Sequence, residues 1–381
     1  MPRRRVALLI ETSNSYARQL LQGVRAWMHA NEPWSVRLME QGRGAGVPAW
    51  LRGWRGDGVI ARVENASIAE ALAESGLPVI DVSAALDGPL FPRVVTDSEA
   101  ATRMAFEHLW ERGLRHFAFC GDPQFRWAEL RGDYFSRWAR EAGCRCAVFR
   151  DFRRKPDAEL AALARWLRGL PRPVGVLACY DIRGQQVLEA CREAGLRVPD
   201  EVAVIGIHND ELLCELCDPP LSSVAPDARR AGYEAAALLA RWMNGEAVPR
   251  EQRQIEPLRV VTRQSTDVVA VDDPQVAAAL RYIRRHATEG IGVADVLRAV
   301  PMARTSLERR FRRSIGCTPR EQIEKTRLEH VKTLLGTTDL PVARIAELTG
   351  FTHPEYLTVV FRRATGTTPR HFREKHRARG G

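Results

Sequence analysis

The sequence predicts an α/β unit with two lobes over residues 1–266 and an all-α unit with two helix-turn-helix motifs over 274–381. Three observations support this prediction. Up to residue 265, short apolar runs alternate with amphipathic helical patterns, which is typical of parallel sheets covered by helices. After residue 274 every pattern is helical. A stretch of 14 residues occurs there twice, which indicates one structural unit used two times.

The apolar runs of the first unit are interpreted as strands and the patterns between them as helices. The expected strands are 6–10, 36–39, 58–61, 78–82, 116–120, 145–149, 175–179, 202–207 and 221–224. The expected helices are 16–29, 98–112, 127–142, 158–170, 184–194 and 228–243. So many strands exceed one small doubly wound sheet, and a chain of 381 residues is long enough for several domains. Two lobes are therefore expected.

Acidic residues and a proline punctuate the chain between 262 and 274, and we place a linker at 267–273. Seven helices are expected beyond it. They cover 275–288, 293–299, 303–314, 319–335, 342–349, 353–364 and 369–376.

The repeat aligns Leu307–Arg320 with Leu357–Arg370 at an offset of 50, and eight of the 14 positions are identical. Each copy places Leu and Phe four residues apart on one helix face, then an Arg-Arg pair, then Gly-x-Thr-Pro. The leucine and the phenylalanine are expected in the core. The glycine is expected to end the helix.

In the second copy, a short helix at 342–348 is followed by Gly350, a residue suited to a tight helix–helix turn. Thr352-x-x-Glu355 has the spacing of a capping box for the next helix, with Pro354 in its first turn. The second helix of each copy could enter a major groove. The expected DNA-facing residues are Arg304, Thr305, Glu308, Arg309, Arg312 and Arg313 in the first copy and His353, Glu355, Thr358, Arg362 and Arg363 in the second. The helix at 319–335, about 25 Å long, would join the two.

The charge distribution indicates double-stranded DNA as the partner. Residues 274–381 hold 21 Lys and Arg against 10 Asp and Glu, a net charge of +11, whereas the rest of the chain carries −1. Basic side chains that contact phosphates release counterions from DNA. The alternative is a basic face kept for solubility, but the charge coincides with the repeat.

Other functional classes lack their signatures. No apolar run approaches the roughly 20 residues of a membrane span, so we expect a cytoplasmic protein with no membrane partner. No phosphate-binding glycine loop and no nucleophile–base motif is present, which argues against an enzyme. Cys214-x-x-Cys217 is the single CxxC among eight cysteines, so neither a metal nor a cofactor is predicted and reduced thiols are expected.

The stretches 345–351, 356–357, 361–363 and 366–370 resemble the DNA-binding domain of AraC/XylS-type transcription regulators. Two positions depart from that family. Ala303 stands where Ser or Thr often caps the first reading helix, which predicts a cap weaker by about 1 kcal/mol. Val359 stands where a basic residue is common, so the second reading helix is expected to contribute mainly phosphate contacts.

Residues 5–265 resemble the sugar-sensing core of LacI/GalR-type regulators, which has the type I periplasmic-binding-protein-like fold, most strongly at 97–119 and 202–224. Joined to an AraC-type tail, this core is similar to the xylose operon regulator group. The resemblance implies a monosaccharide between the lobes, at the carboxyl ends of the strands. The implied ligand-binding residues are Ser13, Asn14, Tyr16, Arg131, Asp181 and His208.

His208 stands where the family usually has an acidic residue. A carboxylate accepts two sugar hydroxyls and a histidine accepts at most one, so another pentose or a related sugar competes with xylose as the expected effector. Structural alternatives remain for three of these residues: a surface ion pair for Arg131, a helix N-cap for Asp181 and a loop position for His208.

These observations predict a sequence-specific transcription regulator of a sugar-utilisation operon, which binds its operator as a homodimer. The family resemblance favours an activator, which would have RNA polymerase as a further partner. The alternative hypothesis is an architectural or effector-independent DNA-binding dimer.

Overall fold

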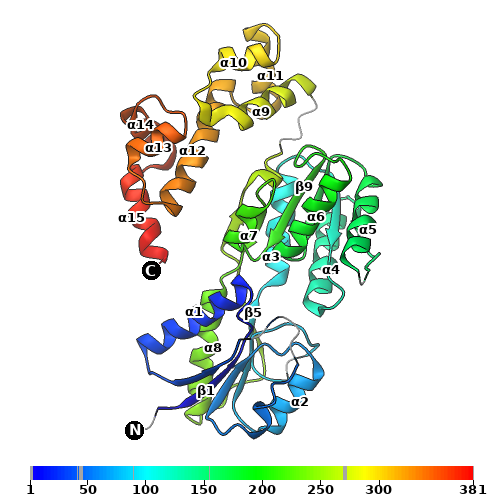
Figure 1. The fold of residues 1–381 in the computed structure, drawn as a ribbon, viewed down its shortest axis with the longest axis vertical. Helices are drawn as coiled ribbons and strands as arrows, with labels where there is room; N and C mark the ends of the chain where they lie inside the picture. Colours follow the sequence, from blue (N-terminus) through cyan, green and yellow to red (C-terminus); the bar gives the residue numbers. More distant parts are fainter. Residues whose placement is uncertain are drawn as a thin grey trace. The chain divides into compact units, whose positions relative to one another are not determined.

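The computed structural model describes residues 3–40, 42, 46–88, 90–153, 155–268 and 273–380. The chain divides into two compact units, Met1–Val268 and Val269–Gly381 (Figure 1). Of the predicted linker 267–273, residues 269–272 lie outside the described residues. Each unit has apolar cores of its own.

The first lobe of the α/β unit is built on a six-stranded sheet in which every pairing is parallel, in the order β11-β5-β4-β3-β1-β2. Its strands are β1 (Arg5–Leu9), β2 (Ser35–Leu38), β3 (Gly58–Ala61), β4 (Val79–Asp81), β5 (Arg93–Thr96) and β11 (Gln252–Ile255). Its helices are α1 (Ser15–Ala30), α2 (Ala66–Glu74) and α8 (Ala228–Met243), with a short 3-10 turn, η1, at Leu51–Gly53. Helices α1 and α8 lie side by side and pack on one sheet face, while α2 packs on the other.

The second lobe is built on the sheet β12-β10-β9-β8-β6-β7, parallel except for β12 against β10. Its strands are β6 (His116–Cys120), β7 (Cys146–Val148), β8 (Val174–Ala178), β9 (Val202–Ile207), β10 (Ser222–Ala225) and β12 (Arg259–Val261). Its helices are α3 (Ser98–Trp110), α4 (Arg126–Glu141), α5 (Pro156–Arg168), α6 (Asp181–Glu193) and α7 (Glu211–Leu216), and η2 (Gln264–Thr266) follows β12.

The chain crosses between the lobes three times, after β5, after β10 and after β11. Each lobe is therefore assembled from segments distant in sequence. Because the carboxyl ends of parallel strands share one edge of a sheet, the loops that follow these strands gather there.

Nine of these strands were predicted from the sequence within one or two residues, but β5, β11 and β12 and the helices α2 and α7 were missed. Strand β11 has the sequence Gln-Arg-Gln-Ile at a sheet edge, with three exposed residues and one buried, so it lacks an apolar run. Strand β12 has only three residues. An edge strand that is polar or only three residues long carries little hydrophobic signal.

The second unit is helical throughout its described residues. It contains α9 (Pro274–His286), η3 (Ala287–Glu289), α10 (Val293–Ala299), α11 (Arg304–Ile315), α12 (Pro319–Thr337), α13 (Val342–Leu348), α14 (Pro354–Thr365) and α15 (Pro369–Gly380). One apolar core lies under α9 to α11, and a second lies under α13 and α14. Helix α12 contributes Ile323 to the first core and Leu328, Val331 and Leu335 to the second.

Candidate functional site

The two copies of the repeat have the same local structure. Residues 311–320 and 361–370 show an identical order of buried, half-buried and exposed positions. Leu307, Phe311, Leu357 and Phe361 are fully buried, which confirms them as core residues. Gly316 and Gly366 end α11 and α14 with φ of 74° and 73°, the left-handed conformation that glycine adopts readily. Each copy is therefore a helix-turn-helix, formed by α10–α11 and α13–α14.

Of the two helix caps predicted from the sequence, the one at Ala303 is observed and the one at Thr352 is not. Ala303 caps α11 without a side-chain hydrogen bond, as its methyl group requires. The capping box predicted at Thr352 and Glu355 was wrong, because α14 begins at Pro354 and its cap is His353, which makes no side-chain cap bond. A proline in the first turn has no N–H that needs a partner, so this helix end depends less on a side-chain cap.

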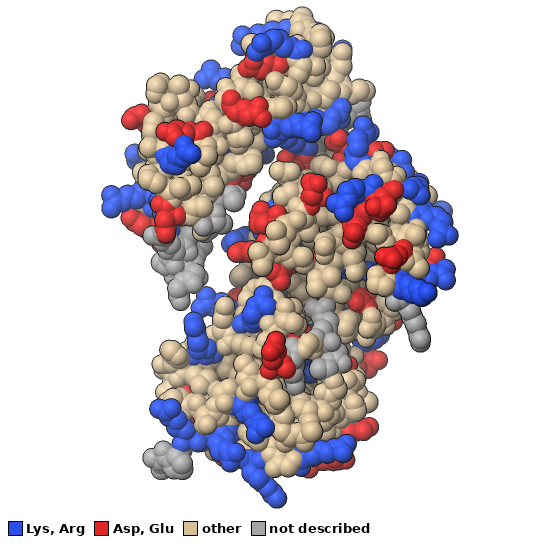
Figure 2. Space-filling model, in the orientation of Figure 1, with Lys and Arg blue, Asp and Glu red and all other residues tan. Residues whose placement is uncertain are grey.

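The side chains predicted to face DNA lie on the exposed or half-exposed side of α11 and α14 or at their start. Two of the basic ones hold acidic partners: Arg304 with Glu308 at 3.0 Å, and Arg363 with Glu324 at 3.0 Å. Arg309, Arg312 and Arg362 are exposed and make no ion pair within the described part of the chain. Figure 2 shows basic and acidic side chains intermixed on the visible face of this unit.

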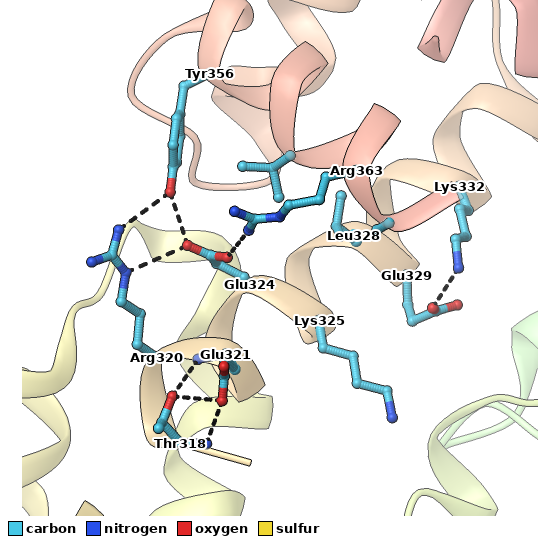
Figure 3. A pocket seen from close by; sticks show the side chains of 12 residues that line it. Thr318, Arg320, Glu321, Glu324, Lys325, Leu328, Glu329, Lys332, Tyr356 and Arg363 are labelled. Carbon is cyan, nitrogen blue, oxygen red and sulfur yellow. Dashed lines mark hydrogen bonds and ion pairs between the residues drawn. The ribbon is translucent and has the colours of Figure 1, made fainter. Parts of the chain in front are cut away.

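Glu324 joins α12 to the second reading helix (Figure 3). Its carboxylate accepts a hydrogen bond from the Tyr356 hydroxyl at 2.8 Å and lies 3.0 Å from the Arg363 guanidinium and 3.5 Å from that of Arg320. The glutamate side chain is only 15% exposed. A half-buried carboxylate with three donors fixes the position of α14 on α12 more firmly than an exposed ion pair would.

Two further contacts connect the halves of this unit. Arg327 on α12 donates to the carbonyl oxygens of Ala287 and Ile291, at 2.8 and 2.7 Å, beside the first helix-turn-helix. Gly350, in the turn of the second, approaches the backbone of 287–290 so closely that a methyl group on it would lie 2.7 Å from the Gly290 nitrogen. These contacts tie the second helix-turn-helix and α12 to the segment in front of the first helix-turn-helix.

The α/β unit contains a small cavity lined by residues of both lobes. The first lobe provides Tyr16, Arg62, Val82, Ser83, Ala84, Val95 and Thr96, and the second provides Ser98, Trp127, Arg131 and His208. Most of these residues are at or just after the carboxyl end of a strand. The cavity has a volume of about 30 Å³. Ligand pockets commonly exceed about 300 Å³, so its side chains nearly fill the site.

Polar and aromatic side chains in the cleft contact one another, within the second lobe and between the lobes. The His208 ring stacks on Tyr16 with 4.9 Å between centroids, and the Arg131 guanidinium lies 3.3 Å from the His208 Nε2 atom. Arg131 also donates to the carbonyl of Cys179 at 2.5 Å and lies over the ring of Trp127. The structure thus brings together Tyr16, Arg131 and His208 from the predicted set.

The other three predicted ligand residues do not line this cavity. The Asn14 side chain caps α1, accepting from the Ala17 N–H at 2.9 Å. Ser13 lies in the same loop and is exposed. Asp181 is 2% exposed, and its carboxylate accepts from the Ser223 hydroxyl at 2.6 Å and the Asp210 N–H at 2.7 Å. Burial raises the pKa of the Asp181 carboxyl to about 7. Asp181 is the first residue of α6 and Tyr180 is its cap, so the N-cap alternative for Asp181 is wrong.

Arg62 was not predicted as a cleft residue. Its guanidinium is 7% exposed, pairs with Glu11 and Glu64 at 2.6 Å each, and lies 5.6 Å from the Tyr16 ring. The sequence did contain a signal for Arg62. The arginine stands directly after the correctly predicted strand β3, and the ends of such strands border the cleft. Trp127, near Arg131 in the cleft, was predicted only as the start of a helix.

Known families match nearly the whole chain. Residues 5–98 match the XylR N-terminal domain, residues 106–266 a periplasmic binding protein-like domain and residues 296–375 a helix-turn-helix domain. The xylose operon regulatory protein of Escherichia coli K12 is 36% identical over 98% of this chain and 97% of its own length. The chain belongs to the family of xylose operon regulatory proteins.

Two further relatives agree with this assignment. The xylose operon regulatory protein of Haemophilus influenzae is 31% identical over 97% of this chain and 98% of its own length. The solved structure of the xylose-binding transcription activator XylR superposes with a TM-score of 0.78 at 34% identity, covering 98% of both chains.

Family membership confirms the two predicted folds, a type I periplasmic-binding-protein-like sensor and a helix-turn-helix domain. It also confirms that the protein is a DNA-binding transcription regulator of a sugar operon and not an enzyme. Within the described residues, no helix is long and apolar enough to cross a bilayer, and no group of three metal-ligating side chains gathers. All eight cysteines are free thiols.

Proposed function

We propose that this protein binds a monosaccharide, xylose or a related pentose, between the lobes of its sensor and activates transcription when the sugar is bound. One observation carries the proposal. Arg62, Arg131, His208 and Tyr16 come from separate segments of both lobes and converge on one cavity. Guanidinium, imidazole and phenol groups are suited to hydroxyl groups.

The small volume of the cavity supports a switch. A cavity of about 30 Å³ corresponds to one water molecule, so a sugar has to replace the contacts of His208 with Tyr16 and Arg131. Separation of the lobes would break the stacking of His208 on Tyr16, because Tyr16 belongs to the first lobe and His208 to the second, whereas Arg131 and His208 would stay together on the second lobe. Sugar binding then favours a lobe arrangement different from the sugar-free one, which any ligand-controlled switch requires.

The polar side chains in the cleft also argue against the alternative of an effector-independent dimer. A cleft that served only to join the lobes would be stabilised best by aliphatic side chains. Here two buried arginines, a histidine and a tyrosine occupy it. Buried charges of this kind are characteristic of binding sites.

The test is thermal unfolding of the full chain with xylose, arabinose, ribose, glucose and glucuronate. A sugar at 100 times its dissociation constant adds about 2.7 kcal/mol, which raises the melting temperature by about 5 °C or more. Arg131→Ala should abolish the shift. Arg137→Ala, on the same helix but in an exposed ion pair with Glu99, should retain it. The absence of a shift with every sugar would refute the proposal.

We further propose that the DNA-binding unit reads two successive major grooves. The contacts of Glu324 with α14, and of Arg327 and Gly350 with the segment 287–291 in front of the first motif, support a fixed spacing of the two motifs. Selection from a random DNA library should return sites with two boxes about 10 base pairs apart in each half-site. Boxes at variable spacing would contradict a rigid pair.

A homodimer is the assembly that we propose, since paired half-sites need paired readers. Large apolar side chains are exposed on the sensor at two places: Leu212 and Leu216 on α7, and Val36 and Leu38 on the edge strand β2. Burial of one such patch would stabilise a dimer. Sedimentation of the double variants Leu212→Glu/Leu216→Glu and Val36→Glu/Leu38→Glu should give monomers for one of them. An activator of this kind would also contact RNA polymerase at the promoter.

A further inference from the structure

The loop that presents His208 to the cleft has an unusual backbone. His208 and Asn209 have φ of 117° and 47°, and they are the only residues other than glycine with positive φ in the described part of the chain. Side chains disfavour this conformation, and two consecutive residues adopt it only where the surroundings hold them. The imidazole position therefore depends on the contacts of the residues beneath the loop.

Asp181 and Ser223 supply those contacts. The Ser223 hydroxyl accepts a hydrogen bond from the Asn209 N–H at 3.0 Å and donates to Asp181 Oδ1 at 2.6 Å. The other carboxylate oxygen, Oδ2, accepts from the Asp210 N–H at 2.7 Å. Asp181 thus binds one backbone N–H of the loop directly and a second through the serine.

The carboxylate is fixed from the opposite side as well. It lies so close to the backbone of Gly206, in β9, that a methyl group on this glycine would be 2.3 Å from Asp181 Oδ1. Arg263 completes the support by donating to Asn209 Oδ1 at 2.9 Å and to the Leu221 carbonyl at 3.0 Å. Side chains from α6, β10 and the segment after β12 therefore converge on one loop.

We infer that Asp181 is a positioning residue for sugar recognition, which acts by holding the His208–Asn209 turn in its left-handed conformation so that the imidazole faces the cleft. This inference rests on the proposed sugar site. Asp181 is buried, both of its oxygens are engaged, and it does not line the cavity. Its influence on the ligand is therefore transmitted by His208 and not by direct contact.

The first experiment measures sugar affinity by calorimetry for the full-length variants Asp181→Asn, Ser223→Ala and Ser222→Ala. The asparagine variant keeps the shape but places an NH₂ group opposite a donor, so binding should weaken about tenfold. Ser223→Ala should weaken it similarly. Ser222 is the matched control: it is equally buried and lies on the same strand, but its hydroxyl bonds to Arg263 and Thr266 and not to the loop.

A double-mutant cycle with His208→Ala tests whether Asp181 affects sugar affinity through the His208 imidazole. If Asp181 acts through the imidazole, Asp181→Asn should cause no further loss of affinity in the His208→Ala background. Additive losses would overturn the inference, and so would an equal loss in Ser222→Ala. A wild-type protein that binds no sugar would instead refute the proposed sugar site itself, which the wild-type titration reveals before any variant is compared.

Discussion

Replacement of Gly350 by alanine tests whether the two helix-turn-helix motifs are locked together. Gly350 has φ of 74°, and a methyl group there would lie 2.7 Å from the Gly290 nitrogen, 2.8 Å from the Thr288 oxygen and 2.9 Å from the Ala287 oxygen. All three are backbone atoms, which cannot rotate away as a flexible side chain could. The turn of the second motif would have to separate from the first motif.

The size of the expected destabilisation follows from a comparison with Gly366. This glycine has φ of 73° but no atom within 4 Å of the position that a methyl group would take. Alanine at 366 therefore incurs only the left-handed backbone strain, about 1–2 kcal/mol. Alanine at 350 incurs the same strain together with an overpacking cost of about 1–3 kcal/mol. The difference between the two variants isolates the contact between the motifs.

Urea unfolding can follow each unit separately, because all nine tryptophans lie between Trp27 and Trp242. Tryptophan fluorescence reports on the sensor, whereas far-ultraviolet circular dichroism also reports on the helices of the DNA-binding unit. Gly350→Ala should shift the dichroism transition to lower urea than Gly366→Ala does and leave the fluorescence transition in place. Equal destabilisation by the two variants would refute a close contact at Gly350.

Three further predictions concern single groups. Tyr356→Phe removes the hydroxyl bonded to Glu324 and should lower the unfolding free energy of the DNA-binding unit by about 1 kcal/mol, measured by dichroism. Arg309→Ala should reduce the slope of log affinity against log salt by about 1, and Arg363→Ala by less, since Arg363 is paired with Glu324. The pKa of Asp181 is raised in the folded state to about 7, so its contribution to sensor stability is complete below about pH 4 and lost as the pH rises through about 7. Unfolding followed by fluorescence between pH 4 and pH 7 should show that the stability of the wild-type sensor falls as the pH rises. The fall should be smaller in Asp181→Asn.

Much of this architecture could be predicted because it depends on local patterns. The strands β3, β6 and β9 were placed at their observed residues since each is a buried apolar run. The two helix-turn-helix motifs followed from a repeat whose leucine and phenylalanine are fully buried. Family resemblance placed Arg131 and His208, and the structure brings them together with Tyr16.

The parts that could not be predicted depend on contacts between distant residues. Arg62 faces the cleft because two carboxylates, from Glu11 and Glu64, hold its guanidinium there. Family resemblance predicted Asp181 as a ligand-binding residue, but the Ser223 hydroxyl and the Asp210 N–H occupy its oxygens. No local pattern distinguishes a carboxylate that faces a cleft from one that turns beneath it.

The two reading helices differ in charge although they share a fold. At the offset of 50, Arg309 of α11 corresponds to Val359 of α14, which is 64% exposed, and Arg313 corresponds to Arg363, which is paired with Glu324. Helix α11 therefore presents more free positive charge, so the larger share of phosphate contacts and of salt dependence should come from the first motif. An exposed valine on α14 is better suited to a thymine methyl group than to a phosphate. This qualifies the expectation that the second helix contributes mainly phosphate contacts. Arg363 is paired with Glu324, Arg362 stays exposed and available to a phosphate, and Val359 favours contact with a base.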